Sequence, residues 1–352
     1  MSGRLVRRLV APLCRPLPAV SLPAVSLLTV SLLTLALAGC GGGSADPDPA
    51  AAVGSTAAAG GAPPAGEGLP GVSGEYGDKP VLSVPDADPA AELRSAILRQ
   101  GDGPEVAPGD LLVVDYLGQI WAGGEPEVFD NSYDRGVPTA FPIGTGGVIK
   151  AWDEVLVGVK AGSRVLMSVP PDKGYGEKGN PPTIESTDTL IFVVDVIASY
   201  NNTSPAAPGT PTGVTGAGGV AVTGDAAGEP AVTIPAGTPP PRAPSVTVLS
   251  QGTGKAVAGR STVVANLVVS SWDGSQQQSS WDKGPQPLTV GDPAAPSPLD
   301  ILVGVPVGSR VLLLLPPPAG QDPAAGNQDP ATASVAAVID VLGAPGPAKE
   351  NA

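Results

Sequence analysis

Apolar and polar residues alternate along parts of this chain in the pattern of half-buried β-strands. In residues 111–117, Leu112, Val114 and Tyr116 share one face at a period of two. The apolar run at 164–169 predicts another strand. The two-residue period also places four residues of segment 190–196 on one face: Leu190, Phe192, Val194 and Val196. These segments predict a sheet with one apolar face.

One short segment between these strands changes to helical spacing. Its apolar residues are Ile149, Trp152, Val155 and Leu156. Gly158 is placed to end the helix, because glycine readily adopts the left-handed conformation that follows a helix terminus. We therefore expect one short helix beside the sheet.

The same blocks occur twice, at an offset near 150 residues. Gly-Ser-Arg-Val-Leu occurs at 162–166 and at 308–312, and Leu-Val-Gly-Val at 156–159 returns at 302–305. The segment 98–103 is echoed at 249–254. This repetition predicts two copies of one domain of about 115 to 125 residues.

The N-terminus carries basic residues, then an apolar run at 20–37, then Leu37-Ala38-Gly39-Cys40. This order predicts a secretory signal with a lipobox-like end, similar to bacterial lipoproteins, in which Cys40 becomes the acylated first residue. An uncleaved transmembrane anchor is the alternative, since the run is nearly long enough to span a bilayer. The lipoprotein interpretation predicts an extracytoplasmic protein that is lipid-anchored to the outer face of the cell membrane, and with either interpretation the bulk of the chain lies outside the cytoplasm.

Composition divides the chain into six segments. They are a signal peptide at 1–39, a Gly/Ala/Pro-rich tether at 40–76, a first domain at 77–200, a linker at 201–227, a second domain at 228–343 and a tail at 344–352.

Residue content limits the possible chemistry. The chain has no histidine, and Cys14 lies in the predicted signal, so we expect no Ser-His-Asp or thiol catalysis, no metal site and no cofactor. Removal of residues 1–39 takes away four of 19 basic residues and none of 33 acidic ones, which leaves a net charge of about −18. Nucleic acid is a poor partner for such a surface.

The aromatic residues are concentrated in the first domain. The chain has 4 Trp, 5 Tyr and 3 Phe, and half of these side chains form one candidate group within residues 116–192. Those six are Tyr116, Phe129, Phe141, Trp152, Tyr175 and Phe192. Because large rings dominate burial energetics, this concentration indicates an aromatic pocket.

Seven blocks in residues 77–200 carry a family resemblance. They are Val-Val-Asp-Tyr-Leu-Gly (113–118), Val-Phe-Asp-Asn-Ser-Tyr-Asp-Arg-Gly (128–136), Phe-Pro-Ile-Gly (141–144), Val-Ile-Lys-Ala-Trp-Asp-Glu (148–154), Gly-Ser-Arg (162–164), Gly-Tyr-Gly (174–176) and Asp-Thr-Leu-Ile-Phe-Val-Val-Asp-Val (188–196). In order and spacing they resemble the FKBP family of peptidyl-prolyl cis-trans isomerases. The resemblance implies an α+β fold, a twisted antiparallel sheet wrapped over one short helix, present here in two tandem copies.

The resemblance also implies a site. Its catalytic residues would be Tyr116, Phe129, Asp130, Trp152, Tyr175 and Phe192, and its further substrate-binding residues Phe141, Val148, Ile149, Ile184 and Arg135. Trp152 would be the pocket floor, Tyr175 and the Ile149 N–H would bind substrate carbonyls, and Arg135 would hold Asp130. Thr139 departs from the family, which often has an aromatic wall residue there, and this change opens the rim.

Each of these residues has a structural alternative. Trp152, Phe192 and Tyr116 would be buried in any stable version of this fold, so each alone indicates a core as well as a site. Asp130 and Arg135 could form only a loop ion pair, and residues 174–176 could form only a turn. The functional interpretation depends on their joint order.

The second copy lacks the pocket residues. The repeat alignment places Asn266 at Tyr116, Gln277 and Gln278 at Phe129 and Asp130, Pro298 at Trp152, Gln321 at Tyr175 and Ala337 at Phe192, while Trp281 aligns with Tyr133. We therefore expect a degenerate, catalytically silent domain.

The resemblance implies an isomerase that acts on X-Pro bonds of unfolded or folding exported proteins. The alternative is a non-catalytic client-binding or chaperone lipoprotein that retains the fold. Capture of macrolides such as rapamycin or tacrolimus is a third possibility.

Overall fold

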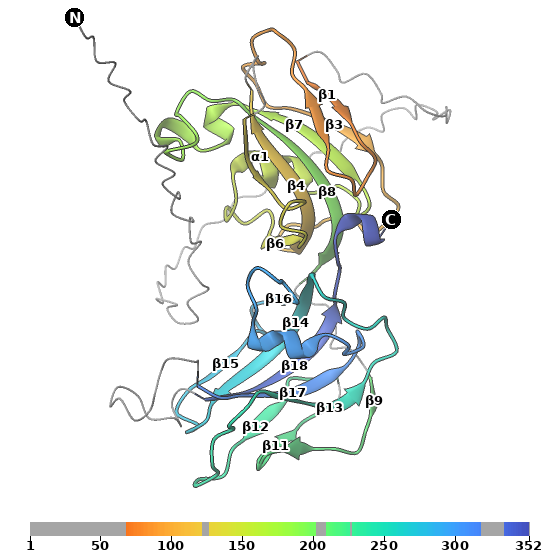
Figure 1. The fold of residues 1–352 in the computed structure, drawn as a ribbon, viewed down its shortest axis with the longest axis vertical. Coiled ribbons are helices and arrows are strands. Elements are labelled where there is room, and N and C mark those ends of the chain that lie inside the picture. The colour runs from red at the N-terminus through yellow and green to blue at the C-terminus, as the bar shows by residue number, and fades with distance from the viewer. Residues whose placement is uncertain (1–67, 122–126, 202–208, 226, 318–333, 352) are drawn as a thin grey trace, which may run out of the picture. The chain divides into compact units, whose positions relative to one another are not determined.

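The computed structural model describes residues 68–121, 127–201, 209–225, 227–317 and 334–351. The predicted signal peptide, with Cys40, and most of the predicted tether lie outside the described residues. Two large antiparallel sheets make up most of what is described, each with a smaller sheet beside it (Figure 1). None of the helices within these ranges is long and apolar enough to cross a membrane.

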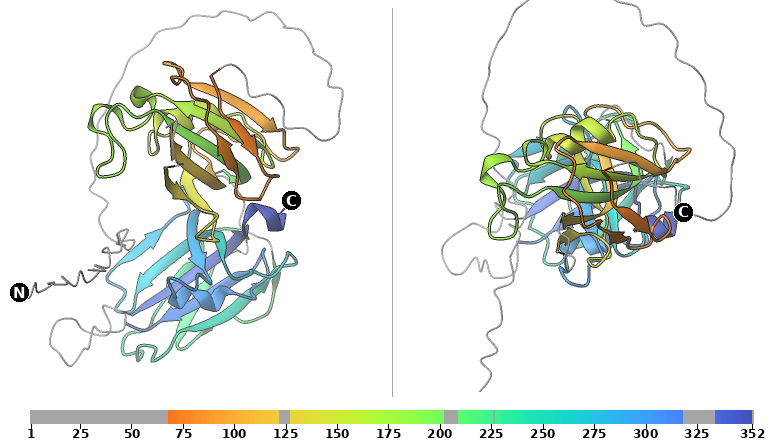
Figure 2. Two further views of the ribbon diagram at one scale, coloured as in Figure 1. Left: turned by 45° about the horizontal axis from the view of Figure 1, so that its top comes forward. Right: turned by 90° about the horizontal axis from the view of Figure 1, so that it is seen from above.

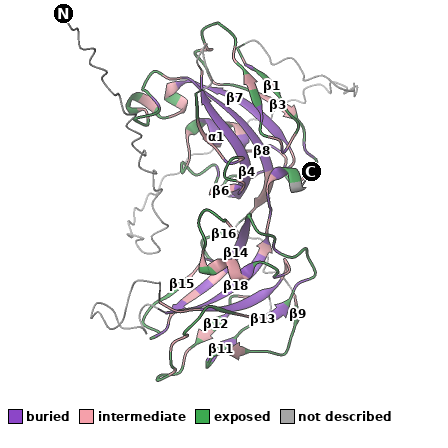
Figure 3. Ribbon diagram, viewed as in Figure 1, coloured by how far each residue is buried: buried purple, intermediate pink, exposed green. Residues whose placement is uncertain are grey.

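The first large sheet has six strands. Their order is β3-β7-β8-β4-β5, and β6 pairs with β4 as well. The strands are β3 (Arg94–Arg99), β4 (Leu111–Ile120), β5 (Val128–Asn131), β6 (Thr139–Pro142), β7 (Arg164–Val169) and β8 (Leu190–Tyr200). The three strands predicted from the apolar periodicity are confirmed. In Figure 3 the central strands β4, β7 and β8 are buried along most of their length.

Helix α1 (Lys150–Leu156) covers one face of this sheet. Trp152 and Leu156 of the helix are buried in one cluster with Tyr116, Met167 and Phe192 of the strands. The helix is followed by Gly158 at φ +83°, where a side chain would be strained, so the predicted helix stop is confirmed. Two 3-10 turns, η1 (Pro171–Lys173) and η2 (Gly176–Lys178), lie on either side of Tyr175.

A hairpin that the periodicity did not predict covers the other face. It consists of β1 (Gly71–Ser73) and β2 (Val81–Ser83), drawn in orange in Figure 1 and Figure 2. Its apolar residues pack against Leu166, Ile191 and Val193, the strand positions that alternate with those facing α1. The first sheet is therefore the middle layer of three.

The second large sheet repeats this plan. Its order is β15-β14-β18-β17-β13-β9, with β16 paired to β14, and a smaller sheet has the order β10-β11-β12. The strands are β9 (Thr210–Pro211), β10 (Gly216–Ala217), β11 (Val220–Thr223), β12 (Ala231–Thr233), β13 (Ser245–Gln251), β14 (Ser261–Ser271), β15 (Gln277–Ser279), β16 (Gln286–Val290), β17 (Arg310–Leu315) and β18 (Val335–Gly343). The neighbours β14-β18-β17-β13 correspond to β4-β8-β7-β3, while a 3-10 helix, η3 (Pro298–Leu302), takes the place of α1. A further 3-10 turn, η5 (Ala348–Asn351), follows β18.

Each large sheet contains a buried Arg-Asp pair that joins two adjacent strands, β7 and β8 in the first sheet and β17 and β18 in the second. In the first, Arg164 Nε lies 2.6 Å from Asp195 Oδ1 and Nη2 lies 2.7 Å from Oδ2, with the side chains 3% and 0% exposed. Tyr133 donates its hydroxyl to the same carboxylate. The second sheet has the corresponding pair Arg310–Asp340. Two parallel N–H···O bonds and the remaining donors satisfy these charges away from water.

Asp195→Ala should destabilise the first domain by about 3–5 kcal/mol, because it leaves the Arg164 guanidinium buried without its counter-charge. We expect its calorimetric transition to fall by roughly 10 °C or more. Asp134→Ala is the matched control, since Asp134 pairs with Lys79 at an exposed position and should change the transition little. A melting curve of Asp195→Ala that coincides with that of Asp134→Ala would contradict this role.

Candidate functional site

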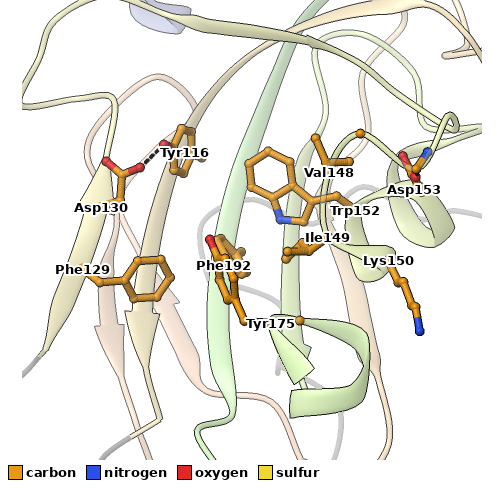
Figure 4. Close-up of a pocket in the computed structure, with 13 residues that line it drawn as sticks. Tyr116, Phe129, Asp130, Val148, Ile149, Lys150, Trp152, Asp153, Tyr175 and Phe192 are labelled. Carbon is orange, nitrogen blue, oxygen red and sulfur yellow. Dashed lines mark hydrogen bonds between the residues drawn. The ribbon is translucent and has the colours of Figure 1, made fainter. Parts of the chain in front are cut away.

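A cavity of about 650 Å³ opens beside α1 in the first domain (Figure 4). Five rings face it: Tyr116 from β4, Phe129 from β5, Trp152 from α1, Phe192 from β8 and Tyr175 from the turn between η1 and η2. The wall is completed by Asp130, Gly146, Gly147, Val148, Ile149, Lys150, Asp153 and Gly174. The sheet and the helix thus bring together residues from 116 to 192.

Trp152 is the centre of the ring packing. Its ring centroid lies 5.4 Å from Tyr116, 5.3 Å from Phe192 and 4.9 Å from Phe141. Phe129 and Phe192 pack edge to face at 5.6 Å. Edge-to-face contacts at these separations are favourable beyond simple area burial. The Trp152 side chain is 7% exposed and its Nε1–H has no acceptor among the described residues.

Gly118 in β4 makes room for two of these rings. A Cβ at this position would lie 2.6 Å from Phe129 Cζ and 3.0 Å from Phe192 Cε1, closer than van der Waals contact allows. The glycine is therefore required by the Phe129–Phe192 pair, and any larger residue would push a ring out of the cavity wall.

Asp130 is held by two partners. The Tyr116 hydroxyl donates to Asp130 Oδ2 and the Arg135 guanidinium to Oδ1. Arg135 also donates to the Tyr116 hydroxyl at 3.1 Å and to Thr139 Oγ1 at 3.3 Å. Burial and the hydrogen bond to Asp130 raise the pKa of Tyr116 to about 12, so this phenol remains a donor at neutral pH. Tyr116 and Arg135 together hold the Asp130 carboxylate at the cavity edge.

Besides the buried Trp152 Nε1–H, two uncharged hydrogen-bond donors at the cavity edge remain for a ligand. The Ile149 N–H has no acceptor within the described part of the chain, because Ile149 has an extended backbone (φ −62°, ψ 146°) and precedes the first turn of α1. The Tyr175 hydroxyl likewise has no protein partner there, and its side chain is 39% exposed. Burial, and then the negative charge of Asp130, raise the pKa of Tyr175 above its ordinary value. Both donors border the ring-lined cavity.

Asp153 fixes the loop that precedes Ile149. Its Oδ1 accepts the Gly144 N–H at 2.6 Å and its Oδ2 the Gly146 N–H at 2.8 Å. The loop then continues through Gly147 and Val148 into the cavity wall. This helix residue therefore determines where the unpaired Ile149 amide lies.

All six residues expected to be catalytic line the cavity, as do Val148 and Ile149. Phe141 and Arg135 are not part of the cavity wall: Phe141 packs on Trp152, and Arg135 donates a hydrogen bond to Asp130. Ile184 is 3% exposed and lies in the core cluster, without a place in the cavity wall. The sequence reasoning missed Lys150 and Asp153, although both are interleaved with Ile149 and Trp152 in the block that it singled out.

The second sheet does not carry these groups. Asn266 was predicted to replace Tyr116, and this is wrong by one position: Asn266 pairs with Asp340 as Asp115 pairs with Asp195, so Leu267 corresponds to Tyr116. The Ser280 contacts with Leu267 match those of Ser132 with Tyr116. The strand register supports two other predicted replacements. Gln278 lies opposite Val269 as Asp130 lies opposite Gly118. Ala337 lies opposite Leu313 as Phe192 lies opposite Met167.

Other counterparts complete this comparison. Trp281 lies with its ring centroid 6.0 Å from the Arg310 guanidinium, as Tyr133 lies beside Arg164, so their predicted equivalence is confirmed. Gln321, the predicted counterpart of Tyr175, lies outside the described residues. Gly118, which makes room for the Phe129 and Phe192 rings, corresponds to Val269 in the second sheet, where both rings are absent. The glycine and the two rings are thus replaced together.

Comparison with known proteins agrees with the geometry. The family of FKBP-type peptidyl-prolyl cis-trans isomerases matches residues 103–197. The FK506-binding protein of Streptomyces anulatus is 37% identical over 122 residues, which are 34% of this chain and 97% of that protein. A probable FK506-binding protein of Corynebacterium glutamicum is 34% identical over 35% of this chain and 99% of its own length. The crystal structure of FkpA from Escherichia coli matches with 34% identity, over 31% of this chain and 48% of that one, at a TM-score of 0.28.

The fold and the site therefore define a class of enzymes that rotate the peptide bond before proline. The domain of this class is the one built on the first large sheet. The chain belongs to the FKBP-type peptidyl-prolyl cis-trans isomerase family. The matched residues 103–197 lie within the first large sheet and its helix.

The isomerisation rate should be nearly independent of pH between about 6 and 9, because the raised pKa of Tyr175 keeps its hydroxyl protonated across this range. Exchange NMR on a proline-containing tetrapeptide, which needs no coupling protease, measures the rate directly. A fall of the rate with a midpoint inside this range would show that a different titrating group controls catalysis.

Proposed function

We propose that the first domain catalyses cis-trans rotation of X-Pro bonds in exported proteins. The observation that carries this proposal is the pair of unpaired donors, the Ile149 N–H and the Tyr175 hydroxyl, at the edge of a cavity lined by aromatic rings. Two carbonyl groups of a peptide can accept from them while a prolyl ring rests over Trp152. The peptide would then be fixed on both sides of the bond that turns.

The barrier to this rotation is amide resonance. It amounts to ~18 to 20 kcal/mol, and the uncatalysed reaction takes tens to hundreds of seconds. The planar amide carries more charge separation than the twisted one, so a cavity of apolar rings stabilises the twisted form relative to the planar form. No nucleophile, metal or proton transfer is needed.

The required stabilisation is modest. A thousandfold acceleration corresponds to about 4 kcal/mol of differential binding of the transition state. One hydrogen bond that strengthens on twisting, together with exclusion of water by Phe129 and Phe192, is sufficient. Asp130, fixed by Tyr116 and Arg135, would lie beside the carbonyl whose polarity changes.

The cavity also supports a proposal about ligands. Two relatives are named for FK506 binding, and each is covered almost completely by the match. We extend that ligand class, macrolides such as tacrolimus and rapamycin, to this cavity. They would occupy the place of the prolyl ring and compete with peptide substrates.

Tyr175→Phe in the full chain should lower kcat/KM for a prolyl tetrapeptide by about three- to tenfold, the loss of one hydrogen bond. Phe129→Ala should lower it at least as much, because it opens the cavity to water. Tyr76→Phe is the matched control: its hydroxyl contacts the Val196 carbonyl, outside the cavity, and its loss should leave the rate unchanged.

Several results would contradict the proposal. Wild-type protein that assists refolding without changing the isomerisation rate would favour the client-binding alternative. An unchanged kcat/KM in Phe129→Ala would show that this cavity is not the site of isomerisation. An undiminished wild-type rate under saturating tacrolimus would exclude the proposed macrolide site.

We propose further that Cys40 is lipid-modified and tethers the enzyme outside the cytoplasm. The support is the order of basic residues, apolar run and Leu37-Ala38-Gly39-Cys40. A lipid at this cysteine and the tether that follows it would hold the first domain close to the bilayer. Newly exported chains would then be its clients.

Cys40→Ser should abolish acylation when the full gene is expressed in a lipoprotein-processing bacterium. Mass spectrometry of the mature N-terminus should find a diacylglyceryl cysteine at position 40 in the unchanged protein. Cys14→Ser is the matched control, because it removes the other cysteine of the chain and should leave the modification intact. Detection of the intact residues 1–39 would support the transmembrane alternative instead.

A further inference from the structure

We propose that Lys150 gives the isomerase a preference for proline bonds flanked by an acidic residue. This inference rests on the proposed function and names a substrate class for the same site. Lys150 is exposed, lines the cavity and directly follows Ile149, whose N–H is one of the two free donors. Figure 4 shows it at the start of α1, beside Ile149.

The charged groups of the cavity wall are Asp130, Lys150 and Asp153. Asp130 is already paired with Arg135 and accepts the Tyr116 hydroxyl. Both carboxylate oxygens of Asp153 accept backbone N–H groups of the preceding loop. The two anions of the wall are thus engaged within the protein.

Lys150 differs from them. Its ammonium group forms no ion pair or hydrogen bond with any residue in the described ranges. Lys173, a basic residue of the turn beside Tyr175, is instead paired with Glu154 at 2.6 Å. The acidic residues Asp172 and Glu177 of the same turn region do not contribute to the cavity wall. Lys150 is therefore available to a charge on the substrate.

Its position determines which part of the substrate it meets. A peptide carbonyl bound by the Ile149 N–H belongs to the proline or to a residue next to it, since the prolyl ring lies over Trp152 in the same cavity. A side chain adjacent to that carbonyl lies within reach of the residue after Ile149. A carboxylate there would gain an ion pair at the cavity edge.

This preference runs against the charge of the whole chain. The formal net charge is −14, so the surface as a whole repels acidic peptides. A local attraction at the cavity therefore has a different signature from long-range steering: it depends on one residue and on the position of the acid relative to proline.

The experiment compares glutamate with its neutral isostere. Exchange NMR on the full chain measures kcat/KM for Ala-Glu-Pro-Ala against Ala-Gln-Pro-Ala, and for Ala-Ala-Pro-Glu against Ala-Ala-Pro-Gln, with blocked ends. We expect a Glu:Gln ratio of about three at one of the two positions in low salt, the size of an exposed ion pair. Added salt should bring this ratio towards one.

Lys150→Gln should bring the ratio to about one, and Lys150→Glu should bring it below one. The ratio compares two peptides on the same variant, so a change in overall rate does not affect it. Lys160→Gln is the matched control, because Lys160 forms no ion pair with any described residue and lies outside the cavity wall, and its substitution removes the same charge.

A wild-type ratio of one at both positions, or a ratio that survives Lys150→Gln, would overturn this inference. Turnover of the glutamine peptides would then still support the isomerase function. Failure of all four peptides to turn over would instead overturn the isomerase function, and this inference with it.

Discussion

The packing of one indole against three other rings determines the geometry of the site. Trp152 can contact Tyr116, Phe141 and Phe192 only if α1 lies across the sheet at the angle that the core cluster enforces. Each such contact adds about 0.5–1.5 kcal/mol beyond area burial. The same contacts therefore stabilise the domain and shape the cavity, so that floor and walls cannot be altered independently.

The polar groups of the site follow from this packing. Because the backbone is extended at Ile149 before the helix begins, its N–H points away from any helical acceptor. Asp153 in the first turn of that helix holds the preceding loop by two amide contacts. A donor that the fold leaves unused is thereby placed beside rings that keep water away, a combination that favours an amide passing through a less polar state.

Much of this could be predicted from sequence, and the limits have physical causes. The strands around Leu112 and Phe192 were predictable because alternation survives wherever one face is buried, and Gly158 marks the end of α1. The β1–β2 hairpin was not predicted, because three-residue strands are too short to show a period. Lys150 was not predicted because a lysine in the first turn of a helix carries no functional signal until its lack of an ion-pair partner is seen. The one-residue error at Asn266 arose because a slip in a strand exchanges its two faces, and only the pairing with Asp340 reveals it.

The hairpin has a consequence for how the catalytic unit is delimited. The family match spans residues 103–197, whereas β1, β2 and β3 all precede residue 103. A fragment trimmed to the matched boundaries would lose an edge strand and the cover over Leu166, Ile191 and Val193, three fully buried aliphatic side chains. An uncovered strip of this kind beside an unpaired strand edge promotes intermolecular β-association. A stable form of this domain thus begins before the segment that the family model matches, ahead of β1 at Gly71.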